Sequence, residues 1–172
     1  MSDALPPARE DLELVRATWP APARVRAVST TRRGGCSRGA YASLNLGARV
    51  EDAPADVKEN RRRLRRALGL TREPAWLHQV HGTRVIDALA VGDGSPADAS
   101  TTDALGVACA ILTADCIPVA LCNRSGTRVA AAHAGWRGLA AGVLDSWCHL
   151  HFFAALRRFF RLVLQKKEVK DY

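Results

Sequence analysis

The sequence predicts a mixed α/β fold in which largely antiparallel sheets are layered with helices. Two patterns carry this prediction. The short apolar runs "IPVALC" (117–122) and "TRVAAAH" (127–133) flank the turn-forming residues "NRSG", a pattern typical of two antiparallel strands. The stretch "GWRGLAAGVLDSW" (135–147) that follows has the spacing of a helix. Short strands joined by short turns favour antiparallel pairing over a regular β-α-β winding.

Further strands are expected before this hairpin. The alternation of Val25, Ala27 and Ser29 predicts a short strand that enters a glycine-rich loop. The stretch "AWLHQVHGTRVIDAL" is predicted to form two strands around a tight turn at Gly82, and "GVACAIL" (106–112) to form one more.

One arginine-rich helix is predicted to begin near Pro54, because proline suits the first helical turn. Val57, Leu64 and Leu68 fall on one face of it, and arginines within 61–66 cover the remainder. We interpret these arginines as a solvated helix face. An RNA-binding ridge is the alternative, but no aromatic residues are interleaved to stack on bases, so nucleic acid is not expected as a partner.

The composition is that of a soluble domain. The chain has 172 residues, of which 48% are hydrophobic and 24% charged, and none of its apolar runs is long enough to cross a bilayer. The acidic, proline-containing N-terminus does not resemble a secretory signal. We therefore expect a cytoplasmic monomer with no membrane partner. The net charge of +8 favours anionic partners such as nucleotides or phosphate.

The chain is expected to have three parts. Residues 1–24 are predicted to be an extended lead-in, and residues 25–147 to form a single domain. Residues 148–172 hold all four phenylalanines and six basic residues, and their spacing is that of a basic amphipathic helix. This tail is expected to pack against the domain, with association through the tail as the alternative.

The predicted hairpin brings a cysteine and a histidine together. A turn centred on "NRSG" places Cys122 opposite Thr127 and Cys116 opposite His133, within reach of a common ion. A thiolate and an imidazole suit zinc or copper, and His81, at the turn before Gly82, is the best third ligand. Two alternatives stay open on this reasoning: a buried thiol with unrelated histidines, and a nucleophilic Cys–His pair.

Three ordered motifs resemble a known family. The segments "STTRRGGCSRGAYASLNLG", "WLHQVHGTRV" and "ADASTTDALGVACAILTADCIPVALCNRSGTRVAAAHAGWRGLAAGVL" are similar to the laccase-domain (multicopper polyphenol oxidase) family, whose members are also described as zinc-dependent purine nucleoside phosphorylases. The resemblance covers roughly residues 19–145. It implies an α/β fold and a metal, Zn²⁺ or alternatively Cu²⁺, held by His81, Cys116 and His133.

The resemblance also implies an activity. It is the phosphorolysis of adenosine, inosine, guanosine and methylthioadenosine to the free base and ribose 1-phosphate, with adenosine deamination as a second reaction at the same site. Purine nucleoside and phosphate are then the partners. Basic residues beside the motifs, Arg32 and Arg137, are candidate anion ligands, with a surface or ion-pair role as the alternative. Asn45 is a candidate substrate contact.

Catalytic roles are expected for Cys116, His133 and Asp115. Asp115 follows "TA" in the cysteine motif, where its carboxylate could orient a ligand or carry a proton, or could instead cap the loop.

Two other functions are weighed against this one. A copper-dependent polyphenol oxidase couples several copper centres through many histidines. The chain has five histidines, which are too few for a conventional set of four copper ions. The family pattern also stops after Leu144, where the following residues resemble unrelated or out-of-frame sequence. A truncated, inactive relative that acts as a binding protein is therefore the second alternative.

Overall fold

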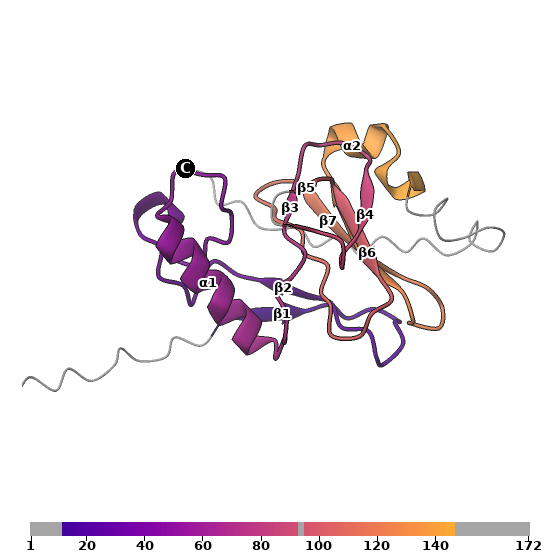
Figure 1. The fold of residues 1–172 in the computed structure, drawn as a ribbon, viewed down its shortest axis with the longest axis horizontal. Coiled ribbons are helices and arrows are strands. Elements are labelled where there is room, and N and C mark those ends of the chain that lie inside the picture. The colour runs from indigo at the N-terminus through magenta and orange to yellow at the C-terminus, as the bar shows by residue number, and fades with distance from the viewer. Residues whose placement is uncertain (1–11, 93–94, 147–172) are drawn as a thin grey trace, which may run out of the picture. The chain divides into compact units, whose positions relative to one another are not determined.

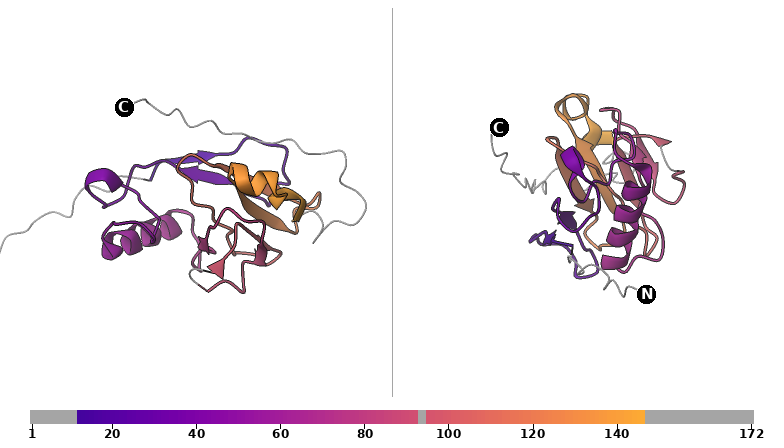
Figure 2. Two further views of the ribbon diagram at one scale, coloured as in Figure 1. Left: turned by 90° about the horizontal axis from the view of Figure 1, so that it is seen from above. Right: turned by 90° about the vertical axis from the view of Figure 1, so that its left-hand side faces the viewer.

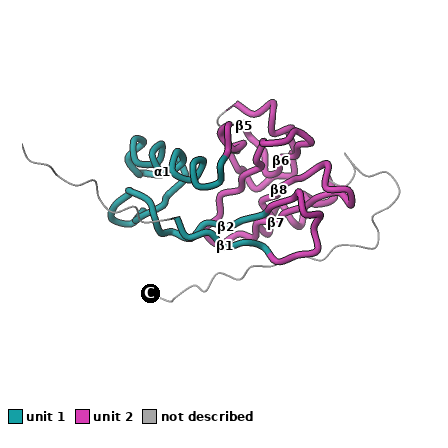
Figure 3. The backbone as a smooth tube through the Cα atoms, turned by 90° about the horizontal axis from the view of Figure 1, so that it is seen from below, with its two compact units in different colours: residues 1–17, 27–69 teal, residues 18–26, 70–172 magenta. Residues whose placement is uncertain are grey.

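The computed structural model describes residues 12–92 and 95–146 (Figure 1). The chain divides into two compact units, residues 1–17 with 27–69 and residues 18–26 with 70–172 (Figure 3). We call them unit 1 and unit 2. The mixed α/β class predicted from the sequence is confirmed, since both units combine strands and helices. None of the helices in the described ranges is long and apolar enough to span a membrane.

Unit 1 consists of one strand pair, one short 3₁₀ helix and one long helix. Strands β1 (Leu14–Arg16) and β2 (Val28–Thr30) pair antiparallel, followed by the 3₁₀ helix Gly39–Tyr41 and helix α1 (Pro54–Ala67). The start of α1 is the one predicted from the sequence, with proline in its first turn. Strand β1 lies within the segment expected to be an extended lead-in.

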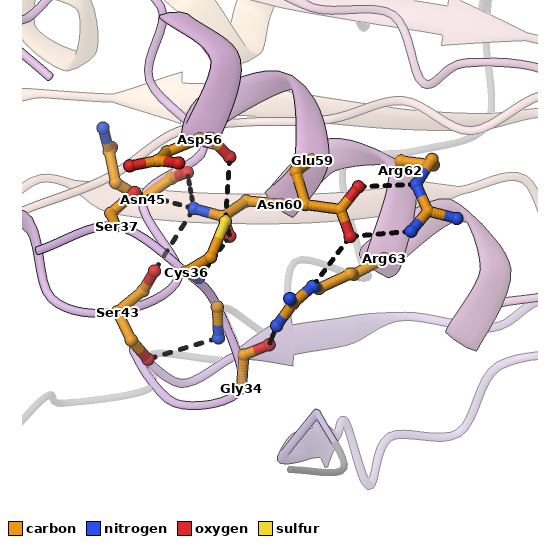
Figure 4. A network of polar contacts seen from close by, with 11 residues as sticks. Gly34, Cys36, Ser37, Ser43, Asn45, Asp56, Glu59, Asn60, Arg62 and Arg63 are labelled. Atoms are coloured by element: carbon orange, nitrogen blue, oxygen red, sulfur yellow. Dashed lines mark hydrogen bonds and ion pairs between the residues drawn. The ribbon is translucent and has the colours of Figure 1, made fainter. Parts of the chain in front are cut away.

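The buried face of α1 contains one polar residue that the apolar pattern did not indicate. Val57, Asn60 and Leu64 are buried, whereas Leu68 caps the helix and is half-buried. Asn60 is completely buried, and its amide nitrogen donates to Ser37 Oγ, Ser43 O and Asn45 O. Its side-chain oxygen accepts the Cys36 backbone N–H (Figure 4). One amide thus holds the whole loop before the helix against α1.

The arginines of α1 are partly tied to the helix itself. Glu59 accepts hydrogen bonds from Arg62 at 2.6 and 2.7 Å and from Arg63 at 3.0 Å (Figure 4). Arg63 also donates to Gly34 O at 3.1 Å. This is the behaviour expected of a solvated face laced with ion pairs.

Unit 2 is built on a four-stranded sheet with the order β4-β6-β8-β7. Its strands are β4 (Val85–Asp87), β6 (Ala99–Thr102), β7 (Ile117–Cys122) and β8 (Val129–Ala134). The β4–β6 pair is parallel and the other two pairs are antiparallel. Small side chains form its core, with Ala99, Val119, Ala132, Ala134 and Val143 in one cluster.

The remaining elements of unit 2 border this sheet. Strands β3 (Leu77–His78) and β5 (Ser95–Pro96) form a separate parallel pair, and helix α2 (Trp136–Ala140) follows directly on the end of β8 (Figures 1 and 2). The helix predicted over 135–147 is interrupted at residues 141–142, and its helical turns resume at 143–146. The predicted tail helix lies outside the described residues.

Two strand predictions for unit 2 are wrong in detail, and one strand was not predicted. The two strands around Gly82 do not pair with each other, because β3 pairs with β5 and β4 with β6. Residues 106–112 form no strand and take part only in an isolated bridge between Ala75 and Cys109. Strand β6 was missed because it consists of small and hydroxyl residues, although all four are buried.

The predicted hairpin register is also wrong, by two residues. Cys122 faces Val129 and Pro118 faces His133, so Cys116 does not stand opposite His133. The centre of the loop lies one residue further along the chain than expected, because Asn123 pairs with Arg128. The Asn123 N–H donates to Arg128 O at 3.0 Å, and the Arg128 N–H donates to Asn123 Oδ1 at 3.1 Å. Strand β7 lies at the sheet edge, as Pro118 requires.

Candidate metal centre

Three segments of unit 2 bring His81, Cys116 and His133 together. His81 lies in the turn between β3 and β4, Cys116 directly precedes β7, and His133 lies near the end of β8. One potential ligand atom of each lies within 4.8 Å of the other two. Cys116 Sγ is 3.8 Å from His81 Nε2, and the two imidazole rings meet edge to face with centroids 4.7 Å apart.

The shifted hairpin register still places Cys116 and His133 on one face. Extending the β7–β8 pairing by one residue beyond Ile117 puts Cys116 opposite Gly135, two residues past His133. Side chains alternate between faces with a period of two, so a shift of two residues leaves each on its original face. Cys116 and His133 are therefore diagonal neighbours across the hairpin, a separation that long side chains bridge.

Gly135 leaves the space into which the three potential ligands converge. A Cβ at this position would lie 2.8 Å from His81 Cδ2, 3.1 Å from Cys116 Sγ and 3.5 Å from His133 Cε1. Gly138, one turn into α2, is close to the backbone of the histidine turn, since a Cβ there would lie 2.9 Å from Gly82 O. Both glycines permit approaches that any side chain would block.

The amide of Gln79 ties the cysteine loop to the histidine turn. Its Nε2 donates to Leu112 O at 2.7 Å, and its Oε1 accepts the Leu112 backbone N–H at 2.8 Å. A paired contact of this kind fixes both distance and orientation. It holds the chain four residues before Cys116 beside the turn that carries His81.

Asp98 contacts both histidine segments. It is completely buried, and its Oδ1 lies 2.8 Å from His133 Nδ1 and accepts the His81 backbone N–H at 2.8 Å. Its Oδ2 accepts the backbone N–H groups of Gly82 at 2.7 Å and Val80 at 3.1 Å. Burial opposes ionisation of this carboxyl, but the hydrogen bonds from His133 and the three N–H groups outweigh it and lower the pKa of Asp98.

Sequence reasoning missed Asp98. One signal was present: the acid sits between Ala97 and Ala99 in a run of small residues, and a carboxylate inside a buried run requires partners. The partners themselves come from residues far along the chain, so the sequence did not indicate which groups Asp98 serves.

The thiol of Cys116 lies in surroundings that favour its protonated form. Burial raises its pKa, and the negative charge of neighbouring Asp115, together with a hydrogen bond to that carboxylate, raises it further. A cation bound beside the sulfur would reverse this preference, because coordination stabilises the thiolate. Asp115 itself is exposed.

The three residues fit a small transition-metal ion. Two imidazoles and a thiolate are the ligands of Zn²⁺ or of copper, and three protein ligands leave the fourth tetrahedral position open. Tetrahedral Zn²⁺ holds a sulfur and a nitrogen ligand about 3.6 Å apart, close to the 3.8 Å between Cys116 Sγ and His81 Nε2. The described ranges contain no other group of three or more potential ligands. His149 and His151 lie outside them.

The proposed substrate residues divide between the two units. Arg137 is exposed in α2 of unit 2, and its guanidinium carbon lies 5.2 Å from the centroid of the Trp136 ring. Arg32 belongs to unit 1, where its Nε donates to Ala42 O at 2.6 Å. Asn45, also in unit 1, donates to Asp52 at 2.8 Å and accepts the Gly47 backbone N–H at 3.0 Å.

Comparisons with known proteins agree with the resemblance seen in the sequence. The chain is 60% identical over 131 residues to a purine nucleoside phosphorylase of Pseudomonas aeruginosa and 53% identical over 134 residues to the purine nucleoside phosphorylase YfiH of Escherichia coli. These alignments cover 74% and 77% of this chain but 52% and 55% of the relatives. The chain therefore spans about half the length of the curated relatives it matches.

Solved structures and a family model agree on the fold. A crystal structure from Neisseria meningitidis, 50% identical, superposes with a TM-score of 0.74 over 81% of this chain and 57% of that one. YlmD from Geobacillus stearothermophilus, 34% identical, superposes with a TM-score of 0.72 over 85% of this chain and 57% of its own. The family model described as multi-copper polyphenol oxidoreductase laccase matches residues 26–155. With its His/Cys/His cluster and these relatives, the chain belongs to the multi-copper polyphenol oxidoreductase laccase family.

Proposed function

We propose that this chain carries a zinc-dependent purine nucleoside phosphorylase site at His81, Cys116 and His133. The observation that supports it most strongly is the convergence of two imidazoles and a thiol within 4.8 Å. The curated relatives that share these motifs are named purine nucleoside phosphorylases. The proposed substrates are phosphate with adenosine, inosine, guanosine or methylthioadenosine, and the products are the free purine and the ribose 1-phosphate.

The reaction defines what the site must do. A phosphate oxygen forms a bond to ribose C1′ while the bond from C1′ to purine N9 breaks, and N9 keeps the electron pair and takes up a proton. The protein has to hold the phosphate beside C1′ and stabilise the charge that develops on the purine. A bound Zn²⁺ supplies Lewis acidity and positive charge at this position.

Residues of unit 2 suit these tasks. We assign phosphate binding to Arg137, because its exposed guanidinium lies in the short helix that begins directly after Gly135. Asp115 is the proposed proton carrier, since its carboxylate is exposed and adjacent to Cys116. Arg32 and Asn45 remain proposed substrate contacts, although the hydrogen bonds of both side chains described above also give each a structural role in unit 1.

Adenosine deamination is the proposed second reaction of the same site. Water replaces the amino group at purine C6, giving inosine and ammonia. The reaction needs a polarised water and a proton carrier, and the three-ligand site with its open fourth position fits that need.

An oxidase function is less well supported. Multi-copper oxidases couple several copper centres, whereas residues 12–92 and 95–146 contain a single group of three potential ligands. The family name alone favours copper chemistry here.

The test compares two cysteine variants of the full chain. Cys116→Ala removes the thiolate of the cluster, whereas Cys122→Ala removes a half-buried thiol at the other end of β7. We expect about one zinc per chain, by elemental mass spectrometry, in the wild type and in Cys122→Ala, and little in Cys116→Ala. Phosphate-dependent release of purine base from inosine should follow the zinc content. Turnover by metal-free Cys116→Ala would disprove the proposal.

A further inference from the structure

We propose that Asp98 is the positioning residue of the metal centre, and that its one carboxylate holds both histidine ligands in place. This inference rests on the proposed function, because it assigns a role within the same site. It concerns a residue that the ligand motifs do not include. Asp98 lies just before β6, outside the three segments that supply the ligands.

Asp98 fixes the proton position on the imidazole of His133. Both oxygens of Asp98 accept backbone N–H groups, which is the arrangement of a carboxylate, and a carboxylate only accepts hydrogen bonds. The 2.8 Å contact to His133 therefore requires the proton on Nδ1. In the neutral ring the lone pair is then on Nε2, the nitrogen that faces away from Asp98. The carboxylate thus selects the tautomer in which His133 presents Nε2 to a metal.

Asp98 also holds the backbone of His81. His81 has a φ of 59°, a left-handed conformation that residues other than glycine adopt uncommonly. The three consecutive backbone N–H groups of Val80, His81 and Gly82 all point to the Asp98 carboxylate, at 3.1, 2.8 and 2.7 Å. These contacts hold the sharp turn and so direct the His81 side chain toward Cys116.

The contacts of Asp98 use every acceptor site of its carboxylate. A carboxylate offers about four lone-pair positions, and Asp98 uses four, two on each oxygen. A carboxamide has one oxygen, so asparagine at this position must give up two of the four contacts. With the amide oxygen in the place of Oδ1, the N–H groups of Val80 and Gly82 face an N–H₂ group. With the oxygen in the place of Oδ2, His133 and the His81 N–H face it. Only a carboxylate accepts all four contacts at once.

The backbone around Asp98 makes the arrangement rigid. Asp98 O accepts the His133 backbone N–H at 2.7 Å, and the Asp98 and Ala99 N–H groups both donate to Arg84 O. The backbone of Asp98 is therefore held between His133 and Arg84, the residue directly before β4. A side chain on so firmly held a backbone can set ligand geometry to within a few tenths of an ångström.

The test measures cobalt binding by the full chain. Co²⁺ replaces Zn²⁺ in such sites, and its visible spectrum reports the ligand geometry. The proteins are the wild type, Asp98→Asn and the control Asp103→Asn, which changes an exposed carboxylate paired with Arg128 just past the end of β6. Affinities come from competition with a chelator of known strength. We expect Asp98→Asn to bind Co²⁺ about 10- to 100-fold more weakly, with altered d–d bands, and Asp103→Asn to match the wild type.

A measurement without substitution keeps the inference testable if Asp98→Asn does not fold. Nitrogen-15 NMR of the metal-free wild type reports the tautomer of His133, and we expect the proton on Nδ1. A predominant Nε2–H tautomer would overturn the inference. Hydrogen exchange of the Val80, His81 and Gly82 amides should be slow in the wild type and faster in any folded Asp98→Asn.

The outcomes separate this inference from the proposed function. Co²⁺ binding by Asp98→Asn with the affinity and spectrum of the wild type would overturn the inference alone. Absence of Co²⁺ binding by the wild type would overturn both. A loss of stability in Asp98→Asn with unchanged cobalt bands in its folded fraction would show a purely structural role, and would also overturn the inference.

Discussion

Gly135 and His81 are so close that a single added carbon on the glycine would come within 2.8 Å of the imidazole. The contact joins the end of β8 to the turn before β4, two segments that meet only in the folded chain. The space that a methyl group at Gly135 would fill is the space between the three ligands.

Gly135→Ala is therefore expected to weaken metal binding. The new methyl group would displace the imidazole of His81 and the sulfur of Cys116. The distances between the potential ligand atoms would then no longer fit a single metal ion. We expect at least a 10-fold loss of Co²⁺ affinity, roughly the effect of disturbing ligand orientation. Gly92→Ala is the matched control, since a methyl group there meets no described atom within 4 Å. Equal affinities in the two variants would contradict the close packing of the ligands.

Metal removal is expected to destabilise unit 2. A ligand that binds only the folded state raises the free energy of unfolding by about 2.7 kcal/mol when its free concentration is 100 times its Kd. The three ligands come from distant segments, so the unfolded chain does not preserve the site. Calorimetry with and without EDTA should show a lower Tm for the wild type in EDTA. In Cys116→Ala the difference should nearly vanish; a shift as large as that of the wild type would show that EDTA acts elsewhere.

Asn60→Ala is expected to destabilise unit 1. The substitution removes the hydrogen bonds of the Asn60 amide to the part-buried backbone groups of Cys36, Ser43 and Asn45, at about 2–4 kcal/mol in total. All four tryptophans lie in unit 2, so urea unfolding of α1 should be followed by far-UV circular dichroism. Arg66→Ala, on the exposed side of the same helix, should change the stability by less than about 0.5 kcal/mol. Equal effects would contradict the central place of Asn60.

Glu59 gives unit 1 a predictable response to acid. Hydrogen bonds from Arg62 first, and from Arg63, lower the pKa of Glu59 from 4.5 to about 2 against the effect of burial. Its contribution to stability is present above the unfolded pKa and is lost as the pH falls from about 4.5 to about 2. Between about pH 5 and about pH 3, the free energy of unfolding of unit 1 should therefore fall in the wild type. In Glu59→Gln the fall should be smaller by about 0.5–1 kcal/mol.

Urea midpoints of α1 at those two pH values measure the difference. Glu51→Gln, which changes an exposed acid in the loop before α1, is the control. If the two variants respond to acid alike, the ion pairs of Glu59 are not the source of the effect.

The features that the sequence predicted well depend on local patterns. Helix α1 begins at Pro54 because proline and the apolar positions of the next turns lie within one stretch of chain. Strand β7 has the bounds expected from its apolar run. The prediction that Cys116 and His133 lie on one face of the hairpin is right despite the wrong register, because the register differs by an even number of residues.

The features that were missed depend on distant partners. The parallel pairing of β4 with β6 joins Val85 to Ala99, and no local pattern specifies it. Strand β6 is polar in composition yet buried, so apolar spacing cannot find it. Asn60 looks like an ordinary surface residue in the sequence, and Asp98 is marked only by its small neighbours. Their complete burial and their hydrogen bonds become evident in the structure.

The backbone at His81 has a consequence for how this protein can be improved. Among residues 12–92 and 95–146, His81 is the only residue other than glycine with a positive φ. Asparagine and glycine suit that conformation better, by about 1 kcal/mol in the case of glycine. Selection for thermal stability alone would therefore favour replacing this histidine, and would remove one of the three proposed metal ligands with it. The turn is a point where backbone stability and the proposed metal binding favour different amino acids.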